Sequence, residues 1–144
     1  MPNKRTFTIE PINQLLKEET KGRVFDPFPY PFQRDALEAM KQVESESIDT
    51  GYYDPPYSLR QLKEVYEGNG LAFTQEMTQS YWRDIEKEWS RIIKPGGKVI
   101  KCGWNSGRIY KGFEITRILL VAHGGHHNDT IVTVQQKMTG GLFN

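Results

Sequence analysis

The sequence is poor in cysteine, in long apolar runs and in excess charge. Its single Cys102 excludes an internal disulfide and fits a reducing compartment. No apolar run approaches the ~20 residues of a membrane span, and the polar start Pro2-Asn3-Lys4-Arg5 lacks the apolar core of a signal peptide. Its length of 144 residues corresponds to one domain, residues 1–144. We therefore expect a cytoplasmic, single-domain protein without a membrane segment.

The balance of charge limits how the chain could attract nucleic acid. It has 19 lysines and arginines against 18 aspartates and glutamates, so the formal net charge is +1. A net charge this small steers a polyanion weakly over long distances. Any contact with nucleic acid must therefore come from a local basic patch.

Glycine is absent from the segment between Asp26 and Asp35, which contains three prolines and only eight intervening residues. A strand–helix–strand unit needs roughly 30 residues, with at least ~10–12 in the crossover. This segment is thus too short to hold a helix and a second strand.

What the sequence does contain is a strand-like run, residues 47–57, that ends in Asp54-Pro55-Pro56-Tyr57. Two prolines have a fixed φ and no N–H, so the chain must leave a sheet at Pro55, with Asp54 at the carboxyl end of the strand. Ligands of open α/β sheets bind at that edge. Asp54 and the Pro55 carbonyl could accept hydrogen bonds from an exocyclic amine, while Tyr57 stacks on its ring. A plain structural turn is the alternative interpretation.

Periodicity and punctuation by proline and glycine predict the other elements. The predicted helices cover residues 12–19, 35–43 and 59–66, and a longer helix runs from Thr74 or Thr78 to Ile93. Gly22 is expected to end the first helix, and Ser58 is the expected N-cap of the third. The predicted strands cover residues 23–26, 98–102 after a tight turn at 94–97, 113–122 and 130–136, the last two as a hairpin; residues 1–10 are expected to be extended.

Several of these segments follow the order seen in one family. They are residues 1–12, Phe25–Phe28, Asp35–Leu37, Asp54–Ser58, Lys94–Gly97, Gly103–Ser106, and 121–125 with 128–130. The chain resembles small adenine-specific DNA methylase-like proteins of phages and prokaryotes, within the amino-methyltransferases that carry Asp-Pro-Pro-Tyr. The resemblance covers most of the chain.

The resemblance implies an α/β fold: a reduced Rossmann-like methyltransferase domain with a mainly parallel sheet and a C-terminal antiparallel hairpin strand. It also implies transfer of a methyl group from S-adenosylmethionine to N6 of adenine in DNA, with Asp54, Pro55, Pro56 and Tyr57 as the catalytic motif. The family normally places a glycine-bearing loop, a helix and a second strand where this chain has residues 26–35. The partners left for the cofactor are Asp26, the backbone near Phe28, Asp35 and the Asp54 turn, so its binding is expected to be weak.

Candidate contacts to nucleic acid lie on both sides of the motif. They are Arg60 and Lys63 after it, the basic residues Lys101, Arg108 and Lys111, and Trp104 with Asn105 at the end of a later strand. A solvated surface for the charges, and packing beneath a loop for Trp104, are the structural alternatives.

Two other functions remain open. The missing cofactor segment favours a degenerate methyltransferase fold that acts as a binding module, as a subunit of a homodimer or heterodimer that completes the cofactor site, or as a phage protein in the host cytoplasm. RNA could replace DNA as the substrate. A metal site at His123, His126, His127 and Asp129 is disfavoured, because the intervening glycines do not preorganise ligands and no cysteine joins them.

Overall fold

A single mixed sheet forms the centre of the fold in the computed structural model, which describes residues 6–29, 32, 34–122 and 129–139. The strands, in sheet order, are β1 (Val24–Phe25), β2 (Ile48–Tyr53), β3 (Ile93–Gly103), β5 (Thr130–Lys137) and β4 (Phe113–Val121). β1, β2 and β3 pair in parallel, whereas β5 runs antiparallel to β3 and to β4. β4 therefore points in the same direction as β1 to β3. The predicted α/β, mainly parallel sheet with an antiparallel C-terminal strand is confirmed.

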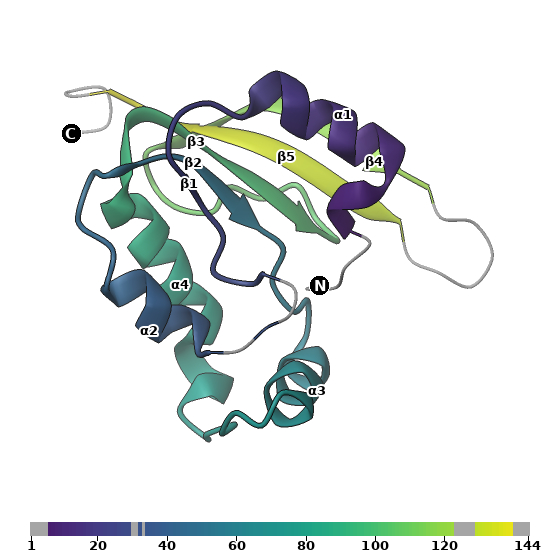
Figure 1. Ribbon diagram of the computed structural model, residues 1–144, viewed down its shortest axis with the longest axis vertical. Coiled ribbons are helices and arrows are strands. Elements are labelled where there is room, and N and C mark those ends of the chain that lie inside the picture. Colours follow the sequence, from purple (N-terminus) through teal and green to yellow (C-terminus); the bar gives the residue numbers. More distant parts are fainter. Residues whose placement is uncertain (1–5, 30–31, 33, 123–128, 140–144) are drawn as a thin grey trace.

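Helices cover both faces of this sheet (Figure 1). They are α1 (Glu10–Glu19), α2 (Ala36–Lys41), α3 (Leu59–Gly68) and α4 (Met77–Ile92). α1 packs its apolar side on one face, where a core forms with β3 and β5, and α2 and α4 pack on the other face. α3 lies beyond the carboxyl end of β2 (Figure 1). The site predicted after β2 thus lies next to α3.

Side-chain caps explain where two helices begin. Ser58 accepts a hydrogen bond from the Gln61 backbone N–H, as predicted, and Asp35 accepts one from Glu38. Such caps satisfy backbone donors that have no partner within the helix. They fix the chain on both sides of β2 and so position the Asp54 turn.

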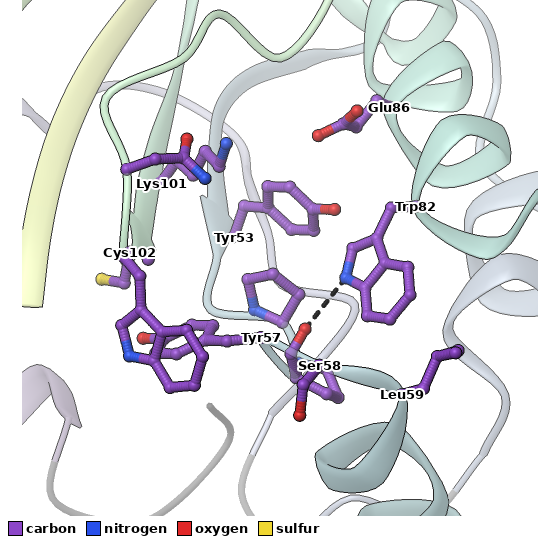
Figure 2. Close-up of a pocket in the computed structure, with 13 residues that line it drawn as sticks. Tyr53, Tyr57, Ser58, Leu59, Trp82, Glu86, Lys101 and Cys102 are labelled. Carbon is purple, nitrogen blue, oxygen red and sulfur yellow. Dashed lines mark hydrogen bonds between the residues drawn. The ribbon is translucent and has the colours of Figure 1, made fainter. Parts of the chain in front are cut away.

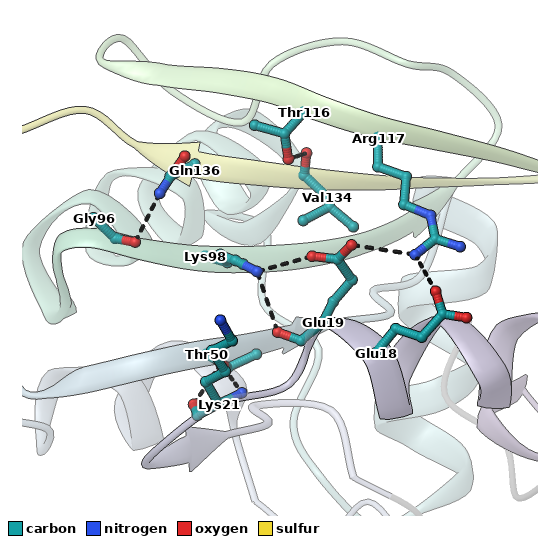
Figure 3. Close-up of polar contacts among 10 residues, drawn as sticks. All are labelled: Glu18, Glu19, Lys21, Thr50, Gly96, Lys98, Thr116, Arg117, Val134 and Gln136. Atoms are coloured by element: carbon teal, nitrogen blue, oxygen red, sulfur yellow. Dashed lines mark hydrogen bonds and ion pairs between the residues drawn. The ribbon is translucent and has the colours of Figure 1, made fainter.

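Ion pairs hold the C-terminal end of α1 to the sheet (Figure 3). Lys98 Nζ of β3 lies 2.8 Å from Glu19 Oε1, and the Arg117 guanidinium of β4 lies 2.9 Å from Glu18 Oε2. The hydrogen bond from Lys98 is the largest cause that lowers the pKa of Glu19. Next to these pairs, Thr50 Oγ1 donates to the Lys21 carbonyl and accepts from the Lys21 N–H.

The structure corrects several predicted boundaries. Thr6–Thr8 form a 3-10 turn, not an extended segment, and α1 ends at Glu19 with Thr20 as C-cap, before Gly22. α4 begins at Met77, and its N-cap is Glu76, not either threonine. The predicted turn at residues 94–97 lies within β3 as an irregularity of the β2–β3 register, because Ile48 pairs with Ile93 but Thr50 with Lys98.

The segment that leads from β1 to α2 is short, as the sequence predicts. Among the described residues from Asp26 to Asp35, none belongs to a helix or strand, and α2 alone makes the crossover. β1 is consequently an edge strand of two residues. The predicted absence of a first helix and second strand holds for these residues.

Gly51 in the middle of β2 provides a test of this packing. A Cβ built there would lie 2.3 Å from a ring carbon of the fully buried Trp89. We expect Gly51→Ala to lower the free energy of unfolding by about 2–3 kcal/mol, since the indole has no room to retreat. Gly68→Ala, where the added Cβ meets nothing within 4 Å, is the matched control. Equal urea midpoints for the two variants would contradict the packing described.

Candidate active site

Asp54 lies at the carboxyl end of β2 and is almost completely buried, with 1% of its surface exposed. Pro55 and Pro56 follow and end the strand, as the sequence predicts. The Tyr57 hydroxyl turns back and donates a hydrogen bond of 2.9 Å to Asp54 Oδ1. The Tyr57 N–H donates to Gln61 Oε1 at 2.8 Å. The first turn of α3 therefore holds the motif in one conformation.

Burial dominates the electrostatics around Asp54. It raises the pKa of the Tyr57 hydroxyl far above its ordinary value, and the Asp54 charge adds to this rise. Burial likewise raises the pKa of the Cys102 thiol on β3, again with a contribution from Asp54. Tyr57 and Cys102 therefore stay neutral beside Asp54 at neutral pH.

Asp26 brings a second carboxyl group to the same edge, at the end of β1. Burial raises the pKa of Asp26 to about 7, because the N–H of Phe28 stabilises the carboxylate only in part and the Asp54 charge disfavours it further. Desolvation and a nearby like charge both favour the protonated acid. The two neighbouring strand ends therefore form an acidic edge that a cationic ligand would stabilise.

A pocket of about 360 Å³ opens beside this edge, between α3, α4 and the end of β3 (Figure 2). We call it the α3–α4 pocket. Its lining includes Pro55, Tyr57 and Trp104, and the Tyr57 and Trp104 rings meet edge to face with their centroids 5.2 Å apart. The Trp82 indole N–H donates to the Pro56 carbonyl at 2.9 Å and so ties α4 to the motif.

The predicted cofactor residues do not all come together. Asp26 and Asp54 share the acidic edge, but the Phe28 ring is 2% exposed and packs in the core against Phe32 and Tyr53. The Phe28 N–H is already bonded to Asp26, and Asp35 caps α2 while it accepts a hydrogen bond from the Tyr66 hydroxyl. Phe28 and Asp35 are therefore engaged in stabilising the fold.

The predicted nucleic-acid contacts divide into three groups. Lys101, Trp104 and Asn105 line the α3–α4 pocket. Arg108 and Lys111 line a separate open groove of about 620 Å³. Arg60 and Lys63 are exposed on α3, where Arg60 pairs with Glu64 at 3.1 Å.

Among the lining residues of the pocket that were not predicted as site residues are Tyr53, Trp82 and Glu86. Tyr53 precedes Asp54, so strand alternation already turns its side chain to the opposite face of the sheet. Trp82 and Glu86 lie one helical turn apart in α4, so they share one face of the helix. The sequence contains these spacings, but only the packing of α4 against β2 brings them to the motif.

No cluster of metal-binding side chains occurs among the described residues, and the three histidines considered for a metal lie outside them. Within the same part of the chain, no helix is long and apolar enough to cross a membrane.

One curated protein shares clear sequence identity with the chain. The Type II methyltransferase M.BamHI of Bacillus amyloliquefaciens is 30% identical over 103 residues, which cover 69% of this chain and 22% of the relative. The chain is homologous to part of a Type II methyltransferase. It spans about a fifth of the length of that protein, and no protein-family model matches it.

Solved structures of methylases resemble the fold more distantly. TTHA0409 of Thermus thermophilus, assigned as a DNA modification methylase, matches with a TM-score of 0.49 and 15% identity, over 83% of this chain and 56% of the other. Its complex with S-adenosyl-L-methionine matches with a TM-score of 0.48 and 16% identity, over 83% and 55%. The yhhF methyltransferase of Escherichia coli gives 0.40 and 9%, over 96% and 60%.

Proposed function

We propose that this chain transfers a methyl group from S-adenosylmethionine to the exocyclic amine of a base in DNA, with N6 of adenine as the acceptor. The observation that carries the proposal is the buried Asp54, held at a sheet edge by Tyr57 and followed by two prolines. The homology to part of a Type II methyltransferase agrees with this chemistry.

The acidic edge fits the charge of the cofactor. S-adenosylmethionine carries a sulfonium and an ammonium, and both cations favour nearby carboxylates. Asp26, whose pKa is raised to about 7 by burial, lacks sufficient compensation for its negative charge. Asp26 and Asp54 would therefore hold the cationic end of the cofactor.

The motif residues act on the amine. A base reaches such a site only when it is flipped out of the stack, at a cost of a few kcal/mol, and the Tyr57 ring would support its face. When bound, S-adenosylmethionine supplies a sulfonium methyl, which the amine nitrogen takes in line while the carbon–sulfur electron pair returns to sulfur. Asp54 and the Pro55 carbonyl accept the amine hydrogens and direct the lone pair of the nitrogen, and Asp54 holds the proton that the amine releases. Catalysis then rests on orientation and on fixed charge.

Methylated nucleosides provide the test. The protein would be incubated with DNA and methyl-labelled S-adenosylmethionine, and the digested nucleosides separated by mass. The proposal predicts N6-methyldeoxyadenosine. N4-methyldeoxycytidine would show that cytosine is the acceptor, and stronger labelling of RNA than of DNA would show that RNA is the substrate. The absence of label from both DNA and RNA would refute the proposal.

The Tyr57 ring and its hydroxyl should have separable effects. Tyr57→Ala removes the stacking surface, so we expect the KM for DNA to rise roughly 10- to 100-fold. Tyr57→Phe keeps the ring and frees Asp54 Oδ1 from the hydroxyl, so its KM should stay within about threefold of the wild type. A KM raised equally by both substitutions would show that the hydroxyl, not the ring, supports the base.

A second candidate function rests on the edge position of β1. Val24 is 40% exposed on this two-residue strand, and the described residues 26–35 add no strand beside it. The chain could thus act as a subunit whose partner completes the cofactor site, or as a binding module. A mass in solution above that of the monomer, together with cofactor binding only in the larger species, would favour the subunit.

A further inference from the structure

The α3–α4 pocket has aromatic walls and a polar floor. Its lining includes Trp82 and the Tyr57–Trp104 pair, whose rings meet edge to face, and Trp104 remains 44% exposed. Flat rings around a cavity of about 360 Å³ suit a planar heterocycle, which is held by stacking and by apolar contact.

The floor carries a polar atom without a partner. Tyr53 is completely buried, and its hydroxyl makes no hydrogen bond with any residue that the structure describes. Figure 2 shows this hydroxyl directed between Trp82 and Glu86. A buried hydroxyl without a hydrogen bond costs free energy, and a ligand that supplies the bond removes that cost.

Two charged side chains lie on opposite sides of Tyr53 in the lining of the pocket (Figure 2). They are Glu86 from α4 and Lys101 from β3. Burial raises the pKa of Glu86 and lowers that of Lys101, and each charge opposes the shift of the other. The floor thus offers a carboxyl, an amine and a hydroxyl within one small cavity, which together can donate and accept hydrogen bonds.

We infer that the α3–α4 pocket binds a nucleobase of a DNA strand and that Tyr53, Glu86 and Lys101 determine which base it accepts. A nucleobase combines a stackable ring with donors and acceptors on one edge, which matches the walls and the floor. Among the residues that the structure describes, no other lining residue of the pocket is charged. The side chains that would read the base thus come from β2, β3 and α4, while Pro55, Pro56 and Tyr57 of the motif line the same pocket.

The surroundings of the opening favour a base within a strand over a free base. Trp104 and Asn105 at the opening continue along the chain into Ser106, Arg108 and Lys111, which line the groove of about 620 Å³ together with Glu114. Basic side chains in such a groove bind phosphates whatever the base sequence, whereas contacts to the edges of the bases determine which sequence is bound. A strand that follows the loop would place its phosphates at the groove and one base in the pocket.

Fluorescence of 2-aminopurine within a short single-stranded DNA oligonucleotide tests the inference, because stacking quenches this adenine analogue. Wild-type protein should quench it saturably. We expect Trp104→Ala to weaken binding roughly 10- to 100-fold, and Tyr53→Phe to weaken it about three- to tenfold. The melting temperature of Tyr53→Phe should not fall, since the substitution removes an unpartnered hydroxyl.

Lys87→Gln is the matched control, because Lys87 is exposed on α4 next to Glu86 but does not line the pocket. It should bind like the wild type. The inference is overturned if Trp104→Ala and Tyr53→Phe also bind like the wild type, if no oligonucleotide is quenched, or if S-adenosylhomocysteine competes with the oligonucleotide, which would assign the pocket to the cofactor's adenine.

The inference deepens the proposed function and rests on its nucleic-acid substrate, but the binding assay contains no methyl donor. Base binding without methylated product would leave the pocket assignment intact and refute the transferase. Methylated product together with pocket substitutions that leave oligonucleotide binding unchanged would support the transferase and refute the pocket assignment.

Discussion

Asp54→Asn is expected to reduce the kcat of methyl transfer by about a hundred- to a thousandfold. Asparagine keeps the size of the side chain but loses the negative charge that would draw the lone pair of the amine toward the methyl group. Removing one preorganised electrostatic group from a buried site costs this much in other enzymes. The carboxylate is 1% exposed, so solvent cannot replace its charge. Initial rates at saturating DNA and S-adenosylmethionine measure the effect.

Asp49→Asn is the matched control for this experiment. Asp49 belongs to the same strand but lies at its other end, where its carboxylate pairs with Lys94 at 3.3 Å. Its kcat should match that of the wild type. A kcat for Asp54→Asn within threefold of the control, with both variants folded by circular dichroism, would show that Asp54 does not act on the amine.

Asp26 is expected to make the protein less stable as the pH rises. Its pKa is about 7 in the folded protein, against an ordinary value of 3.8, so the folded state binds the proton more tightly than the unfolded state does. The contribution of the protonated Asp26 to the free energy of unfolding is therefore complete below about pH 4 and is lost as the pH rises through 7. The shift corresponds to at most about 4 kcal/mol. Asp26→Asn removes this dependence, so the variant should exceed the wild type in free energy of unfolding at pH 8.

Urea denaturation of the two proteins between pH 4 and 8 measures the difference directly. Asp49 again provides the contrast, because the Arg23 N–H and Lys94 lower the pKa of Asp49. The stabilising contribution of the Asp49 carboxylate is lost only as the pH falls through and below its ordinary value of 3.8, so the difference between wild type and Asp49→Asn should stay nearly constant from about pH 5 to 8. A constant difference between wild type and Asp26→Asn across this range would contradict the buried, uncompensated carboxyl.

The order of strands and helices could be predicted because individual residues in the sequence indicate where each element begins and ends. Pro55 ends β2, Ser58 caps α3, and the β-branched residues of the last strand leave little alternative to a sheet. The shortened cofactor side could also be predicted, since eight residues cannot hold a strand–helix–strand unit. These conclusions need no knowledge of tertiary contacts.

The environment of the site could not be predicted in the same way. The backbone near Phe28 was predicted to contact the cofactor, and in the structure the Phe28 N–H bonds to Asp26 while the ring is buried in the core. This environment depends on how the segment after β1 packs against distant elements. The same holds for Glu86, which meets Tyr53 and Lys101 only because α4 lies across the ends of β2 and β3.

We expect a single copy of this chain, without the glycine-bearing segment, to bind S-adenosylmethionine at the Asp26–Asp54 edge. Calorimetric titration with S-adenosylmethionine and S-adenosylhomocysteine at pH 8, with the mass in solution measured on the same sample, tests it most directly. Binding should be saturable with one cofactor per monomer, weakened in Asp54→Asn and unchanged in Asp49→Asn. No heat of binding at millimolar ligand, or binding confined to an oligomer, would contradict it.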